Sequence, residues 1–338
     1  MWAVDPAQVY RRPWYPPTFD RERVQNPGLA RHYDYSAIVV GPSHAQNFSV
    51  AAFERETGRK TLKLSISGGS AREQKLTAEV ALRTGRVQVA YWAIDPLSLA
   101  GDPAHVADGV FPSALYNDSP LDDLTEYLLS GEEVLRSLRI LRRHCCRRTT
   151  FDDAILESRS FWADKDLRFG WPVVLEAWTT AYCRVRRQPP VVTRGVVESA
   201  RVNIEPVIRQ YPRTRFVLFL PPYSRLFAKV LATYTPDVFQ DFLALRAYIY
   251  GLGREPNVEV FDFGFDHEIT GDLTHYQDTT HFDPGVNARM VTAFRDGRFR
   301  VRPEEAHARL DEFVAAALAY PLPDLPRPTC PELGTRPR

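Results

Sequence analysis

Short, mainly apolar runs that alternate with helical patterns constrain this chain more than any other feature of its sequence. The runs occupy residues 37–41, 61–66, 87–94, 215–220 and 258–263. Strands that read as near-continuous apolar runs, separated by helices, are typical of a parallel sheet whose two faces are both covered. We therefore predict an α/β fold with a flavodoxin-like, doubly wound parallel sheet in the strand order 2-1-3-4-5.

The third and fourth runs are separated by about 120 residues, which is too long for one crossover helix. We expect a mainly helical insertion at about residues 99–190, because residues 121–143 and 171–185 have helical patterns. Residues 191–211 then supply the crossover helix. The insertion and the sheet together make one domain at 35–320.

The two ends of the chain are richer in proline than the rest. Residues 1–34 also contain many arginines and aromatic residues, and we predict that they form an extended arm that lies on the domain. Residues 321–338 are predicted to be a proline-rich tail.

Composition excludes some classes of protein. The net charge of +1 gives no reason to expect a nucleic-acid partner. The four cysteines show neither a zinc spacing nor a disulfide framework, and we expect no metal and no cofactor. The sequence has no apolar run of about 18 residues that could span a membrane and no signal-peptide pattern, so the chain as written is expected to be cytoplasmic. Its oligomeric state is left open.

Ser43 is the first candidate site residue, in the loop that follows the first predicted strand. Ligands of open parallel sheets bind beyond the carboxyl ends of the strands. A serine there can act as a nucleophile, and nearby backbone N–H groups can stabilise an oxyanion. The alternative is that Ser43 caps the following helix, which is a common role for serine.

Gly68 is the second candidate, in the Ser-Gly-Gly-Ser loop after the second strand. Glycine lets a backbone N–H approach an anion closely. The alternative is a tight turn before a helix. A nucleotide site is disfavoured, because no phosphate-loop spacing is present.

Asp278 and His281 lie three residues apart beyond the fifth predicted strand. That spacing lets a carboxylate orient an imidazole, which can then take a proton from a serine. Alternatively, Asp278 or Asp283 caps the helix that follows, and His281 is an ordinary surface residue. His275 could support Asp278 or be a simple polar residue.

These blocks together resemble the SGNH (GDSL-like) hydrolase superfamily, and most closely a group of bacterial SGNH-like proteins that are often membrane-anchored. The similarity covers most of residues 20–300. The segments that carry it are 26–30, 37–48, 64–74, 220–223 and 275–287.

The resemblance implies a role for each matching residue. Ser43 would be the nucleophile and an oxyanion donor, Gly68 a second donor, and Asp278 with His281 would complete a triad. The superfamily's third block usually supplies an asparagine as a further donor, but here that block contains Asp95, whose charge would repel an oxyanion. Asn47 is a candidate replacement donor. His44, Asp95 and His275 are expected to line the site.

The resemblance also implies where the protein acts. Because members of that group commonly begin with a membrane anchor, we expect the domain to lie outside the cytoplasmic membrane if an anchor is missing from this chain. The implied activity is that of an esterase or O-acyltransferase on an acylated carbohydrate or cell-envelope polymer, so the expected partner is a small-molecule or polysaccharide ester. The alternative is a catalytically silent domain that binds or assembles envelope polysaccharide, and a nucleotide-binding domain is a weaker third hypothesis.

A basic cluster lies within the expected insertion. It is either a solvated helix face or a basic rim for an anionic polymer or lipid headgroups, which would associate the protein with a membrane surface. Its members are Arg136, Arg139, Arg142, Arg143, His144, Arg147 and Arg148.

Overall fold

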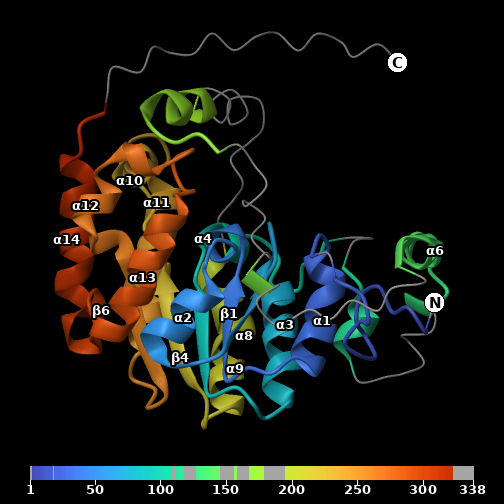
Figure 1. The fold of residues 1–338 in the computed structure, drawn as a ribbon. Helices are drawn as coiled ribbons and strands as arrows, with labels where there is room; N and C mark the ends of the chain where they lie inside the picture. The colour runs from blue at the N-terminus through green and yellow to red at the C-terminus, as the bar shows by residue number, and fades with distance from the viewer. Residues whose placement is uncertain are drawn as a thin grey trace.

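A six-stranded sheet forms the centre of the computed structural model, which describes residues 2–17, 19–107, 111–117, 127–144, 156–157, 167–178 and 195–322 (Figure 1). The strands are β1 (Ala37–Gly41), β2 (Thr61–Ser65), β3 (Val89–Ala93), β4 (Arg215–Leu220), β5 (Val258–Asp262) and β6 (Arg300–Val301). Strands β1 to β5 are parallel and follow the predicted order 2-1-3-4-5. The sixth strand, antiparallel to β5, was not predicted, because two residues are too few to produce an apolar run.

Helices cover both faces of the sheet, because successive side chains of a strand point to opposite faces. Val40 and Trp92 belong to a core shared with one set of helices, whereas Val39 and Tyr91 belong to a second core on the other face. The first core is completed by α1 (Glu22–His32), α3 (Ala71–Arg83), α8 (Val196–Asn203), α9 (Glu205–Gln210) and α11 (Pro236–Leu252), and the second by α2 (Val50–Thr57) and α13 (Pro284–Asp296). Two further helices, α10 (Arg225–Tyr234) and α14 (Ala306–Ala319), pack beside α11.

The N-terminal segment corrects one prediction, because residues 1–34 are not merely an extended arm. They contain helix α1, in which Leu29 is fully buried. Pro27 lies inside this helix and cannot donate to the carbonyl of Arg23. The hydroxyl of Tyr116 donates to that carbonyl instead, at 2.6 Å. The Pro27-Gly28 pair has the pattern of a helix breaker, and a tertiary hydrogen bond compensates for it.

Gly28 explains how the first residues of the chain pack on α1. A Cβ at Gly28 would lie 2.2 Å from the carbonyl oxygen of Gln8, so only glycine allows this close approach. Asp5 then holds the segment by accepting hydrogen bonds from the backbone N–H groups of Val9, at 2.9 Å, and Tyr10, at 2.8 Å.

The described parts of the predicted insertion contain the 3₁₀ helix Ser113–Tyr116 and two longer α-helical segments. Helix α6 spans Gly131–His144, and residues 171–178 form another helix. The remainder of the two predicted helices, at 121–126 and 179–185, lies outside the described residues, as do all four cysteines and the tail from residue 323. The predicted crossover helix is two helices, α8 and α9, with Pro206 in the first turn of α9, where proline is tolerated but cannot continue a preceding helix.

Among the described residues, no helix is both long and apolar enough to cross a bilayer. Within the same residues, histidine, cysteine and carboxylate side chains form no cluster of three that could hold a metal ion.

Candidate active site

Ser43 lies immediately beyond β1, at the carboxyl edge of the sheet. Gly41, the last residue of β1, approaches β3 so closely that an added Cβ would lie 2.6 Å from the Cβ of Ala93. Ser43 begins a short 3₁₀ helix, η1 (Ser43–Ala45). Its Oγ lies 2.8 Å from Nε2 of His281, which is 238 positions away in the sequence. Ser49 caps α2, so the alternative that Ser43 caps this helix is wrong.

His281 is held by Asp278 within a tight loop. Nδ1 of His281 lies 2.7 Å from Oδ2 of Asp278, and Oδ1 of Asp278 accepts the backbone N–H groups of Thr280 and His281, each at 2.7 Å. Burial by itself raises the pKa of Asp278, but the hydrogen bonds and charge of His281, together with the Thr280 amide, lower this pKa to about 2. An ionised carboxylate only accepts hydrogen bonds, so Nδ1 of His281 carries the proton and Nε2 can accept from the Ser43 hydroxyl. We call Ser43, His281 and Asp278 the triad.

The helix-capping alternative holds for Asp283 and not for Asp278. Asp283 caps α13 by accepting the N–H of Gly285 at 2.7 Å. Its other oxygen lies 2.7 Å from Nδ1 of His275. His275 is therefore paired with the helix cap, and of the two roles considered for it, the structure shows a polar residue paired elsewhere and not a partner of Asp278.

His44 lies directly against the triad. Its ring stacks on that of His281, with centroids 4.7 Å apart and planes at 12° to each other. Tyr223 and Phe282 pack around the same ring, with centroid separations of 5.0 and 5.9 Å. Burial, followed by the neighbouring His281, lowers the pKa of His44 to about 4. His44 is therefore a neutral ring at physiological pH, fixed against the imidazole that contacts Ser43.

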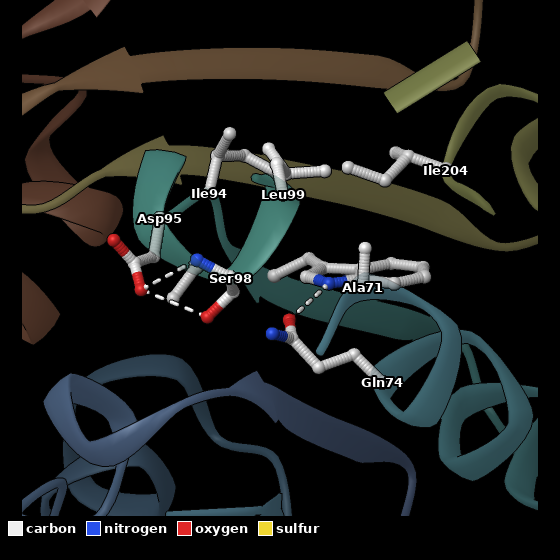
Figure 2. Close-up of a pocket in the computed structure, with 9 residues that line it drawn as sticks. Ala71, Gln74, Ile94, Asp95, Ser98, Leu99 and Ile204 are labelled. Carbon is white, nitrogen blue, oxygen red and sulfur yellow. Dashed lines mark hydrogen bonds between the residues drawn. The ribbon is translucent and has the colours of Figure 1, made fainter. Parts of the chain in front are cut away.

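Asp95, which follows β3, is buried and acts as a helix cap. Figure 2 shows its carboxylate accepting from the N–H of Ser98, at 3.2 Å, and from its hydroxyl, at 2.8 Å. The N–H of Leu97 donates at 3.0 Å, which completes the N-cap of α4 (Pro96–Leu99). The hydroxyl of Tyr223 also donates to Asp95. Four donors thus compensate this charge, a context that the sequence pattern alone did not reveal.

A small pocket lies beside Asp95, at the end of β3 (Figure 2). The indole N–H of Trp92 donates to Oε1 of Gln74 at 3.0 Å, and Nε2 of Gln74 donates to the carbonyl of Gly69, also at 3.0 Å. These bonds connect the end of β3 to the loop that contains Gly68. The pocket is lined by Ala71, Gln74, Trp92, Ala93, Ile94, Asp95, Ser98, Leu99 and Ile204.

Gly68 occupies an exposed turn at the same edge of the sheet, with φ +59°, a left-handed conformation that favours glycine. The N–H of Gly69 donates to the carbonyl of Ile66 at 2.9 Å, so the backbone here forms the tight turn before a helix that was the alternative prediction for this loop. Ile66 in turn donates to the carbonyl of Gly41 at 2.9 Å, which places this loop next to the one that contains Ser43. Asn47, the other candidate donor, is half-buried between η1 and α2.

Helix α1 fixes the loop before Gly68 through residues that the sequence did not single out. Glu22 accepts the N–H of Ser67 at 2.6 Å and the side-chain amide of Gln46 at 2.7 Å. Arg23 donates to the Ser67 carbonyl at 3.3 Å. The loops after β1 and β2 are thus both hydrogen-bonded to α1. The sequence pointed to this helix only through residues 26–30, one of the segments that resemble the SGNH superfamily.

Comparison with known proteins adds little to this geometry. No protein-family model matches the chain, and no curated protein sequence matches it. A solved structure from Streptococcus pneumonia, provisionally identified as a platelet activating factor, is similar with 13% identity and a TM-score of 0.42, over 82% of this chain and 91% of that one. This likeness is too distant to transfer an activity.

Proposed function

We propose that this protein is a serine hydrolase of the SGNH type, an esterase or O-acyltransferase in which Ser43 is the nucleophile. The observation that carries the proposal is the 2.8 Å contact between Ser43 Oγ and His281 Nε2, together with the 2.7 Å contact between His281 Nδ1 and Asp278. Acyl transfer by a serine hydrolase requires a nucleophile that is hydrogen-bonded to a base, and a carboxylate that orients this base.

In this mechanism Ser43 Oγ attacks the ester carbonyl while His281 Nε2 takes the hydroxyl proton. Asp278 stays ionised and stabilises the imidazolium, as its low pKa allows. Collapse of the tetrahedral intermediate releases the alcohol, to which His281 returns the proton, and leaves an acyl group on Ser43. Water or a sugar hydroxyl then attacks the acyl-enzyme, with His281 as base, and regenerates Ser43.

The oxyanion donors in this proposal are the N–H groups of Ser43 and Gly68, with Asn47 as a further candidate. Support comes from the loop of Gly68, which borders the loop of Ser43 and is held by Glu22 and Arg23. Preorganised backbone donors of this kind are worth about 10²–10³-fold in rate each.

The proposed substrate is an acylated carbohydrate or envelope polymer outside the cytoplasmic membrane. This part of the proposal depends on the resemblance of the motifs to the SGNH superfamily. The competing hypothesis, a silent binding domain, is motivated by Asp95 in the third block. Asp95 accepts hydrogen bonds from the N-terminus of α4 and from the Tyr223 hydroxyl, which favours the active enzyme. A carboxylate whose charge is stabilised by such donors repels an oxyanion less than one without hydrogen-bond partners.

Labelling with a fluorophosphonate tests the proposal. Wild-type protein should be labelled, Ser43→Ala should not, and Ser113→Ala, which alters an exposed serine on the 3₁₀ helix Ser113–Tyr116, should be labelled like wild type. A folded wild-type protein that stays unlabelled would favour the silent domain. Acetate release from an O-acetylated polysaccharide, compared with that from p-nitrophenyl acetate, then tests the substrate class.

A further inference from the structure

Helix α6 is packed on the molecule through its polar side. It lies at one end of the molecule, beyond α1 and opposite α14 (Figure 1). Glu133 is buried in an ion pair with Arg21, and the guanidinium of Arg136 donates two hydrogen bonds to Asp20, both at 3.0 Å. Charged and polar side chains, including the buried Ser137, therefore make up much of an interface in which a surface helix normally buries apolar residues, and Ile140 is only half-buried there.

The apolar side of α6 faces solvent instead. Leu135 and Leu138 are 55% and 57% exposed, and Val134 and Leu141 are also exposed. Positions 134, 138 and 141 follow the spacing of one helix face, and 135 borders it. A continuous apolar stripe on a charged helix marks a surface that has a partner.

The charges beside this stripe indicate what the partner is. Arg139, Arg142 and Arg143 are solvent-exposed on the same helix, whereas Arg136 of the predicted basic cluster is turned toward Asp20. An anionic surface with an apolar interior satisfies both the arginines and the leucines.

We propose that α6 is a membrane-surface helix that lies in the headgroup region of an anionic lipid bilayer. The stripe of Val134, Leu135, Leu138 and Leu141 enters the acyl boundary, and Arg139, Arg142 and Arg143 bind lipid phosphates. The helix is about 21 Å long, so it lies flat on the surface and does not span the bilayer. This function is independent of the triad.

Vesicle sedimentation tests the proposal with the full chain. Wild type should bind vesicles of phosphatidylcholine mixed with phosphatidylglycerol, bind phosphatidylcholine alone far more weakly, and lose affinity as salt rises. The variant L135Q/L138Q/L141Q should lose binding to both. The variant R139Q/R142Q/R143Q should lose about fivefold in affinity for each arginine, and only for the anionic vesicles.

Two controls separate the surface from other effects. Leu318→Gln changes an equally exposed leucine on α14 and should bind like wild type, as should Ser43→Ala. Far-ultraviolet circular dichroism of each variant checks that α6 and the sheet are folded.

Three results would overturn the proposal. The first is that wild-type protein stays in the supernatant with anionic vesicles at low salt. The second is that the leucine variant is folded and still binds these vesicles. The third is that light scattering shows a concentration-dependent dimer, which the leucine substitutions dissociate. The last would assign the stripe to a second copy of the chain.

Discussion

The imidazole rings of His44 and His281 lie nearly parallel, 4.7 Å apart, and only one of them contacts Ser43. A flat neighbour restricts rotation of His281 about its side-chain bonds, and Nε2 therefore stays aimed at the hydroxyl. Because burial holds His44 neutral, it adds no positive charge next to the imidazolium that forms during the proposed reaction. In the proposed reaction, His44 is thus a positioning residue for the triad.

Replacing His44 should separate its shape from its chemistry. His44→Phe keeps a flat ring against His281, so kcat for p-nitrophenyl acetate should be close to the wild-type value. His44→Ala removes the stack, and misplacement of the base should lower kcat by about 10- to 100-fold, with KM little changed. Equal losses in the two variants would mean that His44 acts through its nitrogen atoms.

Asp278 and Asp283 form a matched pair for testing the carboxylate. Asp278→Asn leaves an amide that cannot hold the required tautomer of His281, and kcat should fall by about 10⁴-fold. Asp283→Asn keeps a side chain that caps α13 well, so turnover and the free energy of unfolding should change little. A similar loss of turnover in both variants would contradict the assigned roles.

Gly68 and Gly58 have the same left-handed backbone, with φ +59° and +68°, and an added Cβ meets nothing within 4 Å at either position. Alanine at each should cost about 1 kcal/mol in the free energy of unfolding, measured with urea, because of backbone strain alone. Only Gly68→Ala should also lower kcat, since Gly58 caps α2 away from the Ser43 loop. If turnover is unchanged in both, Gly68 is only a turn residue.

Asp95 should act mainly on stability. Asp95→Asn keeps only one of the two oxygens that accept hydrogen bonds and should lower the melting temperature slightly, whereas Asp95→Ala loses the cap of α4 and leaves the Tyr223 hydroxyl unpaired. We expect a cost of about 1–3 kcal/mol for alanine. A large loss of kcat in Asp95→Asn would show that the negative charge of Asp95 is needed for turnover.

Stability should rise with pH between about 4 and about 6.5 because of His44. Its folded pKa of about 4 lies below its usual value of 6.5, so in this window the unfolded chain binds a proton that the folded chain does not. Urea unfolding across this range should show the slope in wild type and a smaller slope in His44→Phe. Asp278, whose pKa is also lowered, stabilises the fold fully above its usual pKa of 3.8, and this contribution is lost as pH falls toward about 2.

The sheet could be predicted from sequence because its strands are buried on both faces, which leaves uninterrupted apolar runs such as 37–41 and 215–220. Strand β6 is too short to leave such a pattern. Helix α1 was missed because the hydrogen bond that makes Pro27 tolerable comes from Tyr116, about 90 positions away.

Local chemistry along the chain also determined the candidates for the site, since a serine after the first strand and an Asp-x-x-His pair after the fifth must lie at one edge of a parallel sheet. Only the tertiary structure decided which polar groups meet. Ser43 contacts His281, His275 turns to Asp283, and Asp95 is compensated by Tyr223. Such pairings join residues from different elements, and their distances depend on how helices pack on the sheet, which no local pattern encodes.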